Sequence, residues 1–390
     1  MFPIPDFAHA PLLVIWEVTR GCALACRHCR ANAVDDRDPR ELTTEEGEKL
    51  LDQIKAMGTP LVVFTGGDPL RRDDLEDLIA HGRSIGLRVA AIPATTPRLT
   101  KERVASLKAA GLHQMAISLD GATAERHDGF RRVPGCFDKA MQAAEWAHAV
   151  GLPLQVNTVF AEWNAEEFDA IAALVDKLEV VFWEVFFLVP TGRGTELTGC
   201  TPPQYQRLFE QLHDHAQKVR YVVKVTEAPH YRVHTMLKGG TAQSHGAHHQ
   251  GRPGAMGGGR PAGMGGPPAM ATAVHGMTKQ SLGSLHHQPG GASGGMGPGI
   301  NSGKGFCFVD HLGNLCPSGF LPMPVGNVRD TNIAKLYRES DLFLQLRDSS
   351  RLKGGCGLCP WRDLCGGSRA RAWAVSGDAF AAEPCCPLAK

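Results

Sequence analysis

The sequence predicts an α/β protein whose strands form a parallel sheet, either doubly wound or curled into a full or partial barrel. Short apolar runs alternate with longer amphipathic stretches, and this alternation repeats six times. The expected strands are residues 12–18, 61–65, 88–92, 114–119, 154–160 and 180–189. The expected helices lie near residues 43–57, 71–85, 100–110, 134–150, 164–178 and 202–218.

Capping residues support these helix boundaries. The run Thr43-Thr44-Glu45-Glu46 resembles a capping box at the start of the first helix. Glycines stand where C-terminal caps belong, at Gly86, Gly111 and Gly151. In both parallel architectures functional groups gather at the C-terminal ends of the strands, so the residues that follow each strand are the candidates for chemistry.

Composition narrows the class of protein. The chain has 390 residues and a formal net charge of +1, which provides no basic surface for a nucleic acid. No run approaches 18 uninterrupted apolar residues, so we expect no membrane association and a soluble, cytoplasmic protein. Twelve cysteines in such a chain would stay reduced, and their clustering therefore indicates metal ligation rather than disulfides.

The composition changes abruptly late in the chain. No Asp or Glu occurs between Ala228 and Val309, and residues 239–300 are dominated by Gly, Pro, Met, Ala, Ser and His. The histidines there could bind metal, although no spacing fixes a coordination geometry. We expect four parts: an N-terminal extension (1–11), the barrel (12–235), a flexible insertion (236–303) and a cysteine-rich C-terminal domain (304–390).

The first cysteine cluster follows the first expected strand. Cys22, Cys26 and Cys29 have the spacing C-x3-C-x2-C, and the next cysteine is distant. Three thiolates can hold three irons of a four-iron cluster and leave the fourth iron free to bind a substrate atom. The alternatives are three reduced loop cysteines or a zinc site completed by His28.

This placement resembles the radical SAM superfamily, whose partial (β/α)6 barrel binds S-adenosylmethionine (SAM) at the open iron of a [4Fe-4S] cluster. The residues Gly66, Gly67, Asp68 and Pro69 follow the second strand and resemble the GGEP motif of that family. The resemblance implies that backbone carbonyls there accept hydrogen bonds from the methionyl ammonium, and glycines permit the close approach. In isolation the same four residues would be an ordinary turn.

Later strand ends supply further residues that match the family. By resemblance, Ser118, Asp120 and Asn157 lie near the ribose and carboxylate of SAM, where hydroxyl, carboxylate and amide groups suit paired hydroxyls. Arg131 matches a basic residue that pairs with the SAM carboxylate. Val189 would flank the adenine.

A second cysteine cluster lies near the C-terminus. Cys356, Cys359 and Cys365 form C-x2-C-x5-C, and Cys385 and Cys386 follow. This spacing resembles the SPASM/Twitch extension of radical SAM enzymes, in which such a set plus a final cysteine holds one auxiliary [4Fe-4S] cluster. We favour Cys386 as the fourth ligand, with Cys385 as the substitute. A four-cysteine zinc site is the alternative.

The sequence departs from the full SPASM pattern, which has ligands for another auxiliary cluster. Two of the family's cysteine positions are occupied here by Ser318 and Arg369, and only Cys307 and Cys316 remain nearby. Two ligands cannot hold a cubane, so we predict one auxiliary cluster. The alternative is a second auxiliary cluster that is held by Cys307, Cys316, Cys385 and one further donor.

Two stretches indicate the substrate class. The stretches "CGGSRARAWAVSGD" (365–378) and "TEAPHYR" (226–232) resemble radical SAM proteins of alternative haem and denitrification-haem biosynthesis. Those proteins remove or decarboxylate propionate side chains of tetrapyrroles. The candidate carboxylate anchors are Arg131, Arg193, His230, Tyr231 and Arg232.

The resemblance also implies the mechanism. An electron donor such as flavodoxin or ferredoxin reduces the first cluster, SAM is cleaved to a 5′-deoxyadenosyl radical, and that radical removes a substrate hydrogen atom. A peptide maturase is the first alternative, although maturases often carry an N-terminal leader-recognition domain and about ten residues precede the first strand here. A non-catalytic iron–sulfur or metal-handling protein is the second alternative.

Overall fold

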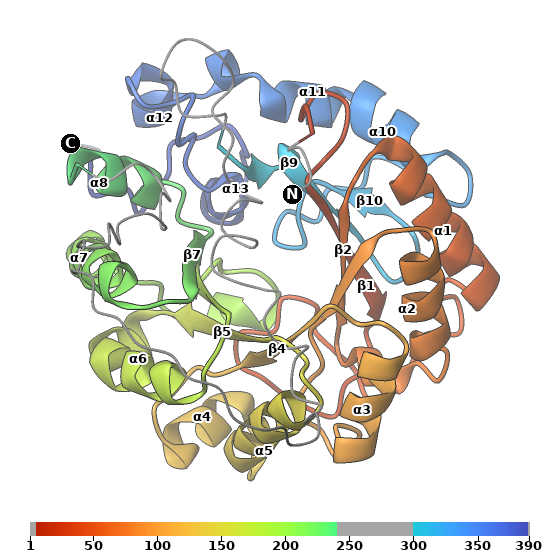
Figure 1. Cartoon of the computed structure of the whole chain (residues 1–390). Helices are drawn as coiled ribbons and strands as arrows, with labels where there is room; N and C mark the ends of the chain where they lie inside the picture. Colours follow the sequence, from red (N-terminus) through yellow and green to blue (C-terminus); the bar gives the residue numbers. More distant parts are fainter. Residues whose placement is uncertain (1–4, 240–298, 389–390) are drawn as a thin grey trace, which may run out of the picture.

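A computed structural model describes residues 5–239 and 299–388 of the chain. Seven parallel strands follow one another around the sheet in sequence order, each hydrogen-bonded to the next (Figure 1). They are β1 (Leu13–Thr19), β2 (Leu61–Gly66), β3 (Arg88–Ala91), β4 (Gln114–Ser118), β5 (Leu154–Phe160), β6 (Phe182–Phe187) and β7 (Val222–Thr226). The predicted parallel α/β partial barrel is therefore confirmed.

Helices cover the outer face of the curved sheet (Figure 1). They are α1 (Thr44–Met57), α2 (Leu75–Ser84), α3 (Lys101–Ala109), α4 (Ala124–Arg131), α5 (Cys136–Ala149), α6 (Phe168–Lys177), α7 (Pro202–Lys218) and α8 (Tyr231–Leu237). The capping box that the sequence predicts is present, because Thr43 and Glu46 bond each other's backbone N–H groups.

The C-terminal part of the chain joins the same sheet. Strand β9 (Gly305–Val309) pairs in parallel with β1, and β10 (Leu315–Cys316) pairs antiparallel with β9. The short β8 (Asn301–Ser302) pairs with β9. The remaining helices are α10 (Ile333–Glu339), α11 (Asp341–Arg347), α12 (Gly354–Leu358) and α13 (Arg369–Ser376).

Alternation along each strand divides the side chains between two environments. In β1, Val14, Trp16 and Val18 are fully buried in the main core, whereas Leu13 and Ile15 line a cavity inside the barrel. The main core therefore lies between sheet and helices, and every second residue of a strand is free to shape the interior.

The structure corrects several sequence-based boundaries. Helix α2 begins at Leu75 rather than at residue 71, because Pro69–Arg71 forms a separate 3-10 turn capped by the Asp68 side chain. Strand β6 is shorter than the expected range 180–189. The sequence reading missed α4, β7 and α8.

The domain division and the membrane expectation both concern parts of the chain that the structure describes incompletely. Most of the expected insertion, 236–303, lies outside the described residues, and the four-part division stays a prediction. Among the helices that are described, none is long and apolar enough to span a membrane.

Candidate active site

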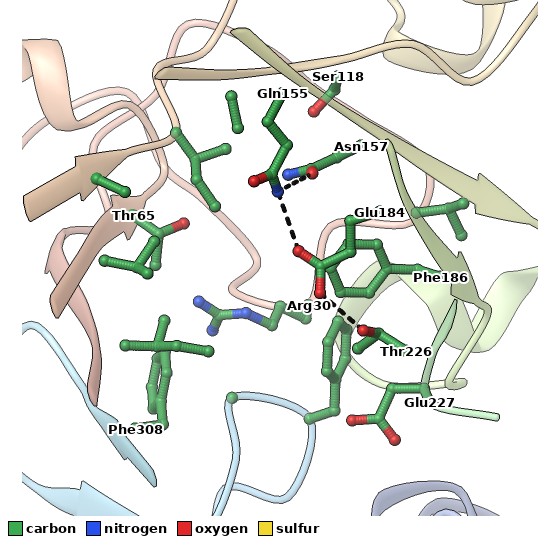
Figure 2. A pocket seen from close by; sticks show the side chains of 18 of the residues that line it. Arg30, Thr65, Ser118, Gln155, Asn157, Glu184, Phe186, Thr226, Glu227 and Phe308 are labelled. Atoms are coloured by element: carbon green, nitrogen blue, oxygen red, sulfur yellow. Dashed lines mark hydrogen bonds between the residues drawn. The ribbon is translucent and has the colours of Figure 1, made fainter. Parts of the chain in front are cut away.

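A cavity of about 390 Å³ lies inside the barrel and extends from the beginnings of the strands to the loops that follow them. Its wall includes the loop after β1, the inward side chains of β2 to β7, and the loop that follows β10. Figure 2 shows part of this wall, with Arg30, Glu184 and Gln155 extending into the same space. A volume of this size is typical of a small-molecule site.

The first cysteine loop places its three thiols at this cavity. Cys22 and Cys26 are buried, Cys29 is half-buried, and all three line the cavity wall. Burial raises the pKa of Cys22 to about 12, so this side chain is a thiol that must lose its proton to bind iron. Each sulfur accepts one hydrogen bond: Leu24 N–H to Cys22 (3.3 Å), Arg131 Nη1 to Cys26 (3.5 Å) and Ala33 N–H to Cys29 (3.4 Å).

Three thiols suit three irons of a four-iron cluster, whereas a structural zinc site would need a fourth ligand. In the described part of the chain, the one group of three ligand atoms within 4.8 Å of one another comes from His127, Asp128 and Cys136. The His127 group is a poor metal site, because Nδ1 accepts the Asp120 N–H and Nε2 must then carry the ring proton.

The glycine pair after β2 packs closely against the first cysteine loop, and hydrogen bonds join the two segments. The N–H of Gly67 donates to Thr19 O and that of Asp68 to Gly21 O, both at 2.8 Å. A Cβ on Gly67 would lie 2.5 Å from Gly21 O and 2.8 Å from the Cys22 Cβ, and Gly66 has a φ of +152°. Only glycines allow the two loops to approach this closely.

The Asp68 side chain stays within the protein. Its carboxylate accepts hydrogen bonds from the Leu70 N–H (3.1 Å), the Ala94 N–H (3.3 Å) and the Thr96 hydroxyl (2.6 Å). Burial raises the pKa of this carboxyl group. The backbone around Asp68 is thus fixed by its side chain, which fits a role for this segment through backbone groups.

The loop after β6 also holds the cysteine loop. Arg193, which the sequence offered as a carboxylate anchor, donates through Nε to Cys26 O (2.9 Å) and through Nη1 to Ala33 O (3.2 Å). Its Nη2 is buried with no partner among the described residues. Val189, by contrast, packs in a small separate core with Leu321 and other apolar residues.

Asp120 and Arg131 form a buried ion pair beside Cys26. Burial would raise the pKa of Asp120, but the Arg131 guanidinium outweighs it and holds that pKa below its usual value. The second carboxylate oxygen of Asp120 accepts the Val159 N–H at 2.9 Å. In the structure, Arg131 therefore bridges the carboxylate and a proposed cluster ligand.

A row of polar side chains crosses four adjacent strands at one register. Ser118 pairs with Asn157, Asn157 with Glu184, and Glu184 with Lys224. Gln155 Nε2 donates to Asn157 Oδ1 (2.7 Å) and to Glu184 Oε2 (3.0 Å), as Figure 2 shows. All five line the cavity, so the expected Ser118 and Asn157 belong to a larger polar surface.

Several cavity residues were missed from the sequence, although a signal was present. Glu184 and Lys224 each interrupt an apolar strand, "FWEVFF" and "VVKVT", at an inward position. Glu17 also interrupts an apolar strand, β1; it is buried and accepts hydrogen bonds from Arg30 Nη1 and His311 Nδ1, both at 2.9 Å. A charged residue inside an apolar strand of a barrel is expensive to bury, and its position therefore indicates the interior.

The C-terminal cysteine loop has the same kind of sulfur environment. The Cys356 sulfur accepts the Glu383 N–H at 3.3 Å, and Cys365 accepts the Gly367 N–H at 3.3 Å. Cys356, Cys359 and Cys365 are half-buried, as is Cys386. Hydrogen bonds from backbone N–H groups to sulfur are a known means of tuning iron–sulfur clusters.

Three further cysteines of the C-terminal part lie outside this set. Cys385 packs against the main core beside Tyr205 and Arg371, which favours Cys386 as the fourth ligand. Cys307 is fully buried in β9, opposite Val14 of β1, and Cys316 is buried in β10. Burial raises the pKa of Cys316 to about 12.

The predicted substrate trio divides between two locations. Among the described residues, Arg232 is the member of the trio that lines the cavity. His230 and Tyr231 pack their rings against Phe209 of α7, with ring centroids 5.0 and 5.2 Å away. The nearby Glu227 also lines the cavity, and burial raises its pKa.

Comparison with known proteins agrees with this geometry. Residues 16–175 match the Radical SAM superfamily. The chain is 34% identical over 378 residues to the AdoMet-dependent heme synthase of Methanosarcina barkeri, covering 97% of each chain. It is 35% identical over 385 residues to the enzyme of the same name from Oleidesulfovibrio alaskensis, covering 98% of this chain and 89% of that one.

The fold comparison adds a solved structure. Streptococcus suis SuiB bound to precursor peptide SuiA matches with a TM-score of 0.69 and 15% identity, covering 97% of this chain and 76% of that chain. The chain belongs to the radical SAM superfamily. It is accordingly an enzyme that uses SAM and a [4Fe-4S] cluster, and it is similar over its whole length to AdoMet-dependent heme synthases.

Proposed function

We propose that this enzyme oxidatively decarboxylates propionate side chains of an iron tetrapyrrole. The observation that carries the proposal is the position of the cavity between the two cysteine loops. Cys22, Cys26 and Cys29 form part of its wall, and Arg232 and Asn301, which bond the backbone of the C-terminal loop, form another part. The full-length similarity to AdoMet-dependent heme synthases supports the substrate class.

The residues present fit the groups that the superfamily requires. Three hydrogen-bonded thiols would hold the [4Fe-4S] cluster, and the Gly66–Pro69 segment, Ser118, Asp120, Asn157 and Arg131 would surround SAM. When bound, the cluster and SAM supply a 5′-deoxyadenosyl radical. Cys356, Cys359, Cys365 and Cys386 would hold one auxiliary [4Fe-4S] cluster.

The cavity wall suits a flat, mainly apolar molecule with carboxylate groups. Ile15, Val63, Phe186 and Phe308 line it, and Arg30 lies over the Phe308 ring at 4.4 Å. In haem, two vinyl groups take the place of two of the propionates of a four-propionate porphyrin. Each conversion of a propionate to a vinyl group therefore removes CO₂ and leaves a C=C bond. Arg30 and Lys224 are among the cations on this wall that would meet the remaining propionates.

The protein's own groups have positioning roles. The Glu17 and Glu184 carboxylates hold Arg30 and Lys224 at fixed places on the wall. Arg193 and the glycine pair hold the cysteine loop, and the apolar lining keeps water from the reacting carbon. A one-electron donor such as flavodoxin or ferredoxin would reduce the first cluster. All twelve cysteines are described and none forms a disulfide, which supports a cytoplasmic site of action.

Anaerobic turnover tests the proposal. Reconstituted protein, SAM and dithionite are incubated with an iron porphyrin that carries four propionates, and products are identified by mass spectrometry. We expect 5′-deoxyadenosine and stepwise conversion of propionate to vinyl groups. Formation of 5′-deoxyadenosine with no change in any porphyrin, together with modification of a peptide, would overturn the tetrapyrrole assignment in favour of a maturase.

The metal-handling alternative has a separate test. It depends on the histidine- and methionine-rich residues 240–298, which lie outside the described residues. Replacing them with a short Gly/Ser linker should leave iron content and SAM cleavage unchanged in an enzyme of the proposed kind. If the linker variant loses metal binding, and neither this variant nor the wild type cleaves SAM, the enzyme proposal is contradicted in favour of the metal-handling alternative.

A further inference from the structure

Two arginines beside the C-terminal cysteine loop lack the usual counter-charge. Arg369 is 2% exposed and donates through Nη1 to Ala379 O (2.9 Å) and Ala381 O (2.8 Å). Its Nη2 lies 3.7 Å from the Cys356 sulfur. Arg232 donates through Nη2 to Ile300 O (2.7 Å) and through Nη1 to Leu364 O (3.4 Å), next to Cys365. Within residues 5–239 and 299–388, neither has a carboxylate within 4.0 Å.

Other buried arginines of this chain are paired. Among the described residues these are Arg72, which pairs with Asp74, Arg131 with Asp120, and Arg371 with Glu383, whereas Arg369 is buried and Arg232 half-buried without such a pair. An unpaired buried cation is costly, so proteins place such a charge beside an anion or a bound ligand. Backbone carbonyls supply partial charge only. The set of cysteines beside both guanidinium groups can become anionic, because a four-iron cluster held by four thiolates is a net anion.

We propose that Arg369 and Arg232 are the counter-ions of the auxiliary cluster and raise its reduction potential. The inference rests on the ligand set proposed above. In the SPASM pattern, position 369 is a cysteine that belongs to a second auxiliary cluster. This chain carries at that position a cation whose guanidinium contacts Cys356, a ligand of the cluster that remains. The substitution therefore removes one cluster and changes the electrostatics of the other.

The direction of the effect follows from charge. A fixed cation stabilises the more negative, reduced form of a cluster and so favours electron acceptance. Decarboxylation needs such an acceptor: after hydrogen-atom removal, the bond to the carboxylate carbon breaks, CO₂ leaves, a C=C bond forms, and one electron remains. The auxiliary cluster, held by Cys356, Cys359, Cys365 and Cys386, would supply the acceptor for that electron. Arg232 lines the cavity and bonds the loop, so it lies on the side from which the electron arrives.

Redox titration of the reconstituted protein, followed by EPR, tests the proposal. The variants are Arg369→Gln, Arg369→Lys and Arg232→Gln. The matched control is Arg362→Gln, because Arg362 lies between Cys359 and Cys365 in the same loop but is exposed to solvent. We expect each glutamine variant to weaken the electron affinity of the auxiliary cluster about tenfold, a shift of about 59 mV to lower potential for a one-electron couple. The lysine variant and the control should stay near the wild-type value.

The iron and sulfide content distinguishes an error in the proposed ligand set from an error in the counter-ion proposal. Wild-type protein with a single cluster would show that the ligand set is wrong, and the counter-ion proposal would fall with it. Two clusters with the same auxiliary potential in wild type and both glutamine variants would overturn the counter-ion proposal alone. An equal shift in Arg362→Gln, or in Arg369→Lys and Arg369→Gln, would also overturn it, since loop disturbance rather than buried charge would then be the cause.

Discussion

The two cysteine loops differ in where they face. The first loop follows β1, presents three thiols to the cavity, and is enclosed by the loops after β2 and β6. The second carries four suitable cysteines at the molecular surface, where Leu358 is 89% exposed, and meets the cavity wall through Arg232 and Asn301. Under the proposed function, the first loop would bring a ligand to an open iron, and the second would hold a closed cluster on the far side of the substrate.

The loops also differ in how their arginines are balanced. Arg131 contacts the Cys26 sulfur and is neutralised by Asp120, whereas Arg369 contacts the Cys356 sulfur with no carboxylate in the described residues. An arginine that is paired with a carboxylate adds little net charge, whereas an arginine without a carboxylate raises the reduction potential of a cluster beside it. The contrast suits a first cluster that must be a strong reductant and a second that must accept electrons.

Removal of a first-loop ligand should have the largest effect. In Cys26→Ala, we expect SAM cleavage to fall by more than about 10³-fold, because the group acts as part of a catalytic unit. The measurement is 5′-deoxyadenosine formed under dithionite. Cys200→Ala is the control, since Cys200 is buried outside both loops and should cost about 1 kcal/mol of stability only. Full cleavage by Cys26→Ala would refute the assignment of the first loop.

A methyl group on Gly67 should be nearly as damaging. The added Cβ would contact Gly21 O and Cys22 Cβ at less than 3 Å and displace the cysteine loop. Displacements of about 1 Å cost about 10²-fold in rate, so we expect a loss of that order in SAM cleavage. The control is Gly129→Ala, where a Cβ meets nothing within 4 Å. Equal activities of the two variants would contradict the close packing.

The buried pair beside the first loop should affect stability. Arg131→Met leaves the Asp120 carboxylate buried without its partner, and we expect a loss of about 3–5 kcal/mol in urea unfolding of the cluster-free protein. The double variant with Asp120→Asn should recover part of this loss. No recovery in the double variant would show that the pair is not coupled.

The same pair predicts a pH dependence. The folded-state pKa of Asp120 lies below its ordinary value of 3.8, so the contribution of the pair is present above about pH 4 and is lost as the pH falls through the folded value. The stability difference between wild type and Arg131→Met should therefore narrow in acid. A difference that stays constant from pH 7 to pH 3 would contradict this.

The wall between the loops should show the smallest effect. Thr226→Val removes a hydrogen bond of 2.7 Å to Glu184, worth about 1 kcal/mol. We expect porphyrin affinity, measured by absorbance titration, to fall by less than about tenfold. SAM cleavage without porphyrin should be unchanged. A drop in that basal cleavage would place Thr226 with the first loop instead of with the substrate.

Much of this arrangement follows from the sequence, for a physical reason. Six strand–helix units depend on local patterns, namely apolar periodicity and caps, and these predicted a parallel sheet. The resemblance of the cysteine spacing and strand-end motifs to the radical SAM superfamily narrowed the prediction to a partial barrel. The pairing of β9 with β1 depends on a contact across most of the chain, which no local pattern encodes. The roles of Arg193 and Arg369 likewise depend on which distant carbonyls and sulfurs the fold brings to their guanidinium groups.

The most direct test of the division between the loops is Cys359→Ala, assayed for 5′-deoxyadenosine and for decarboxylated porphyrin in the same anaerobic reaction. Because the first loop remains intact, we expect 5′-deoxyadenosine to form at close to the wild-type rate while decarboxylated porphyrin is lost. If Cys359→Ala loses both products together, as Cys26→Ala should, or keeps both, the separate roles assigned to the two loops are contradicted.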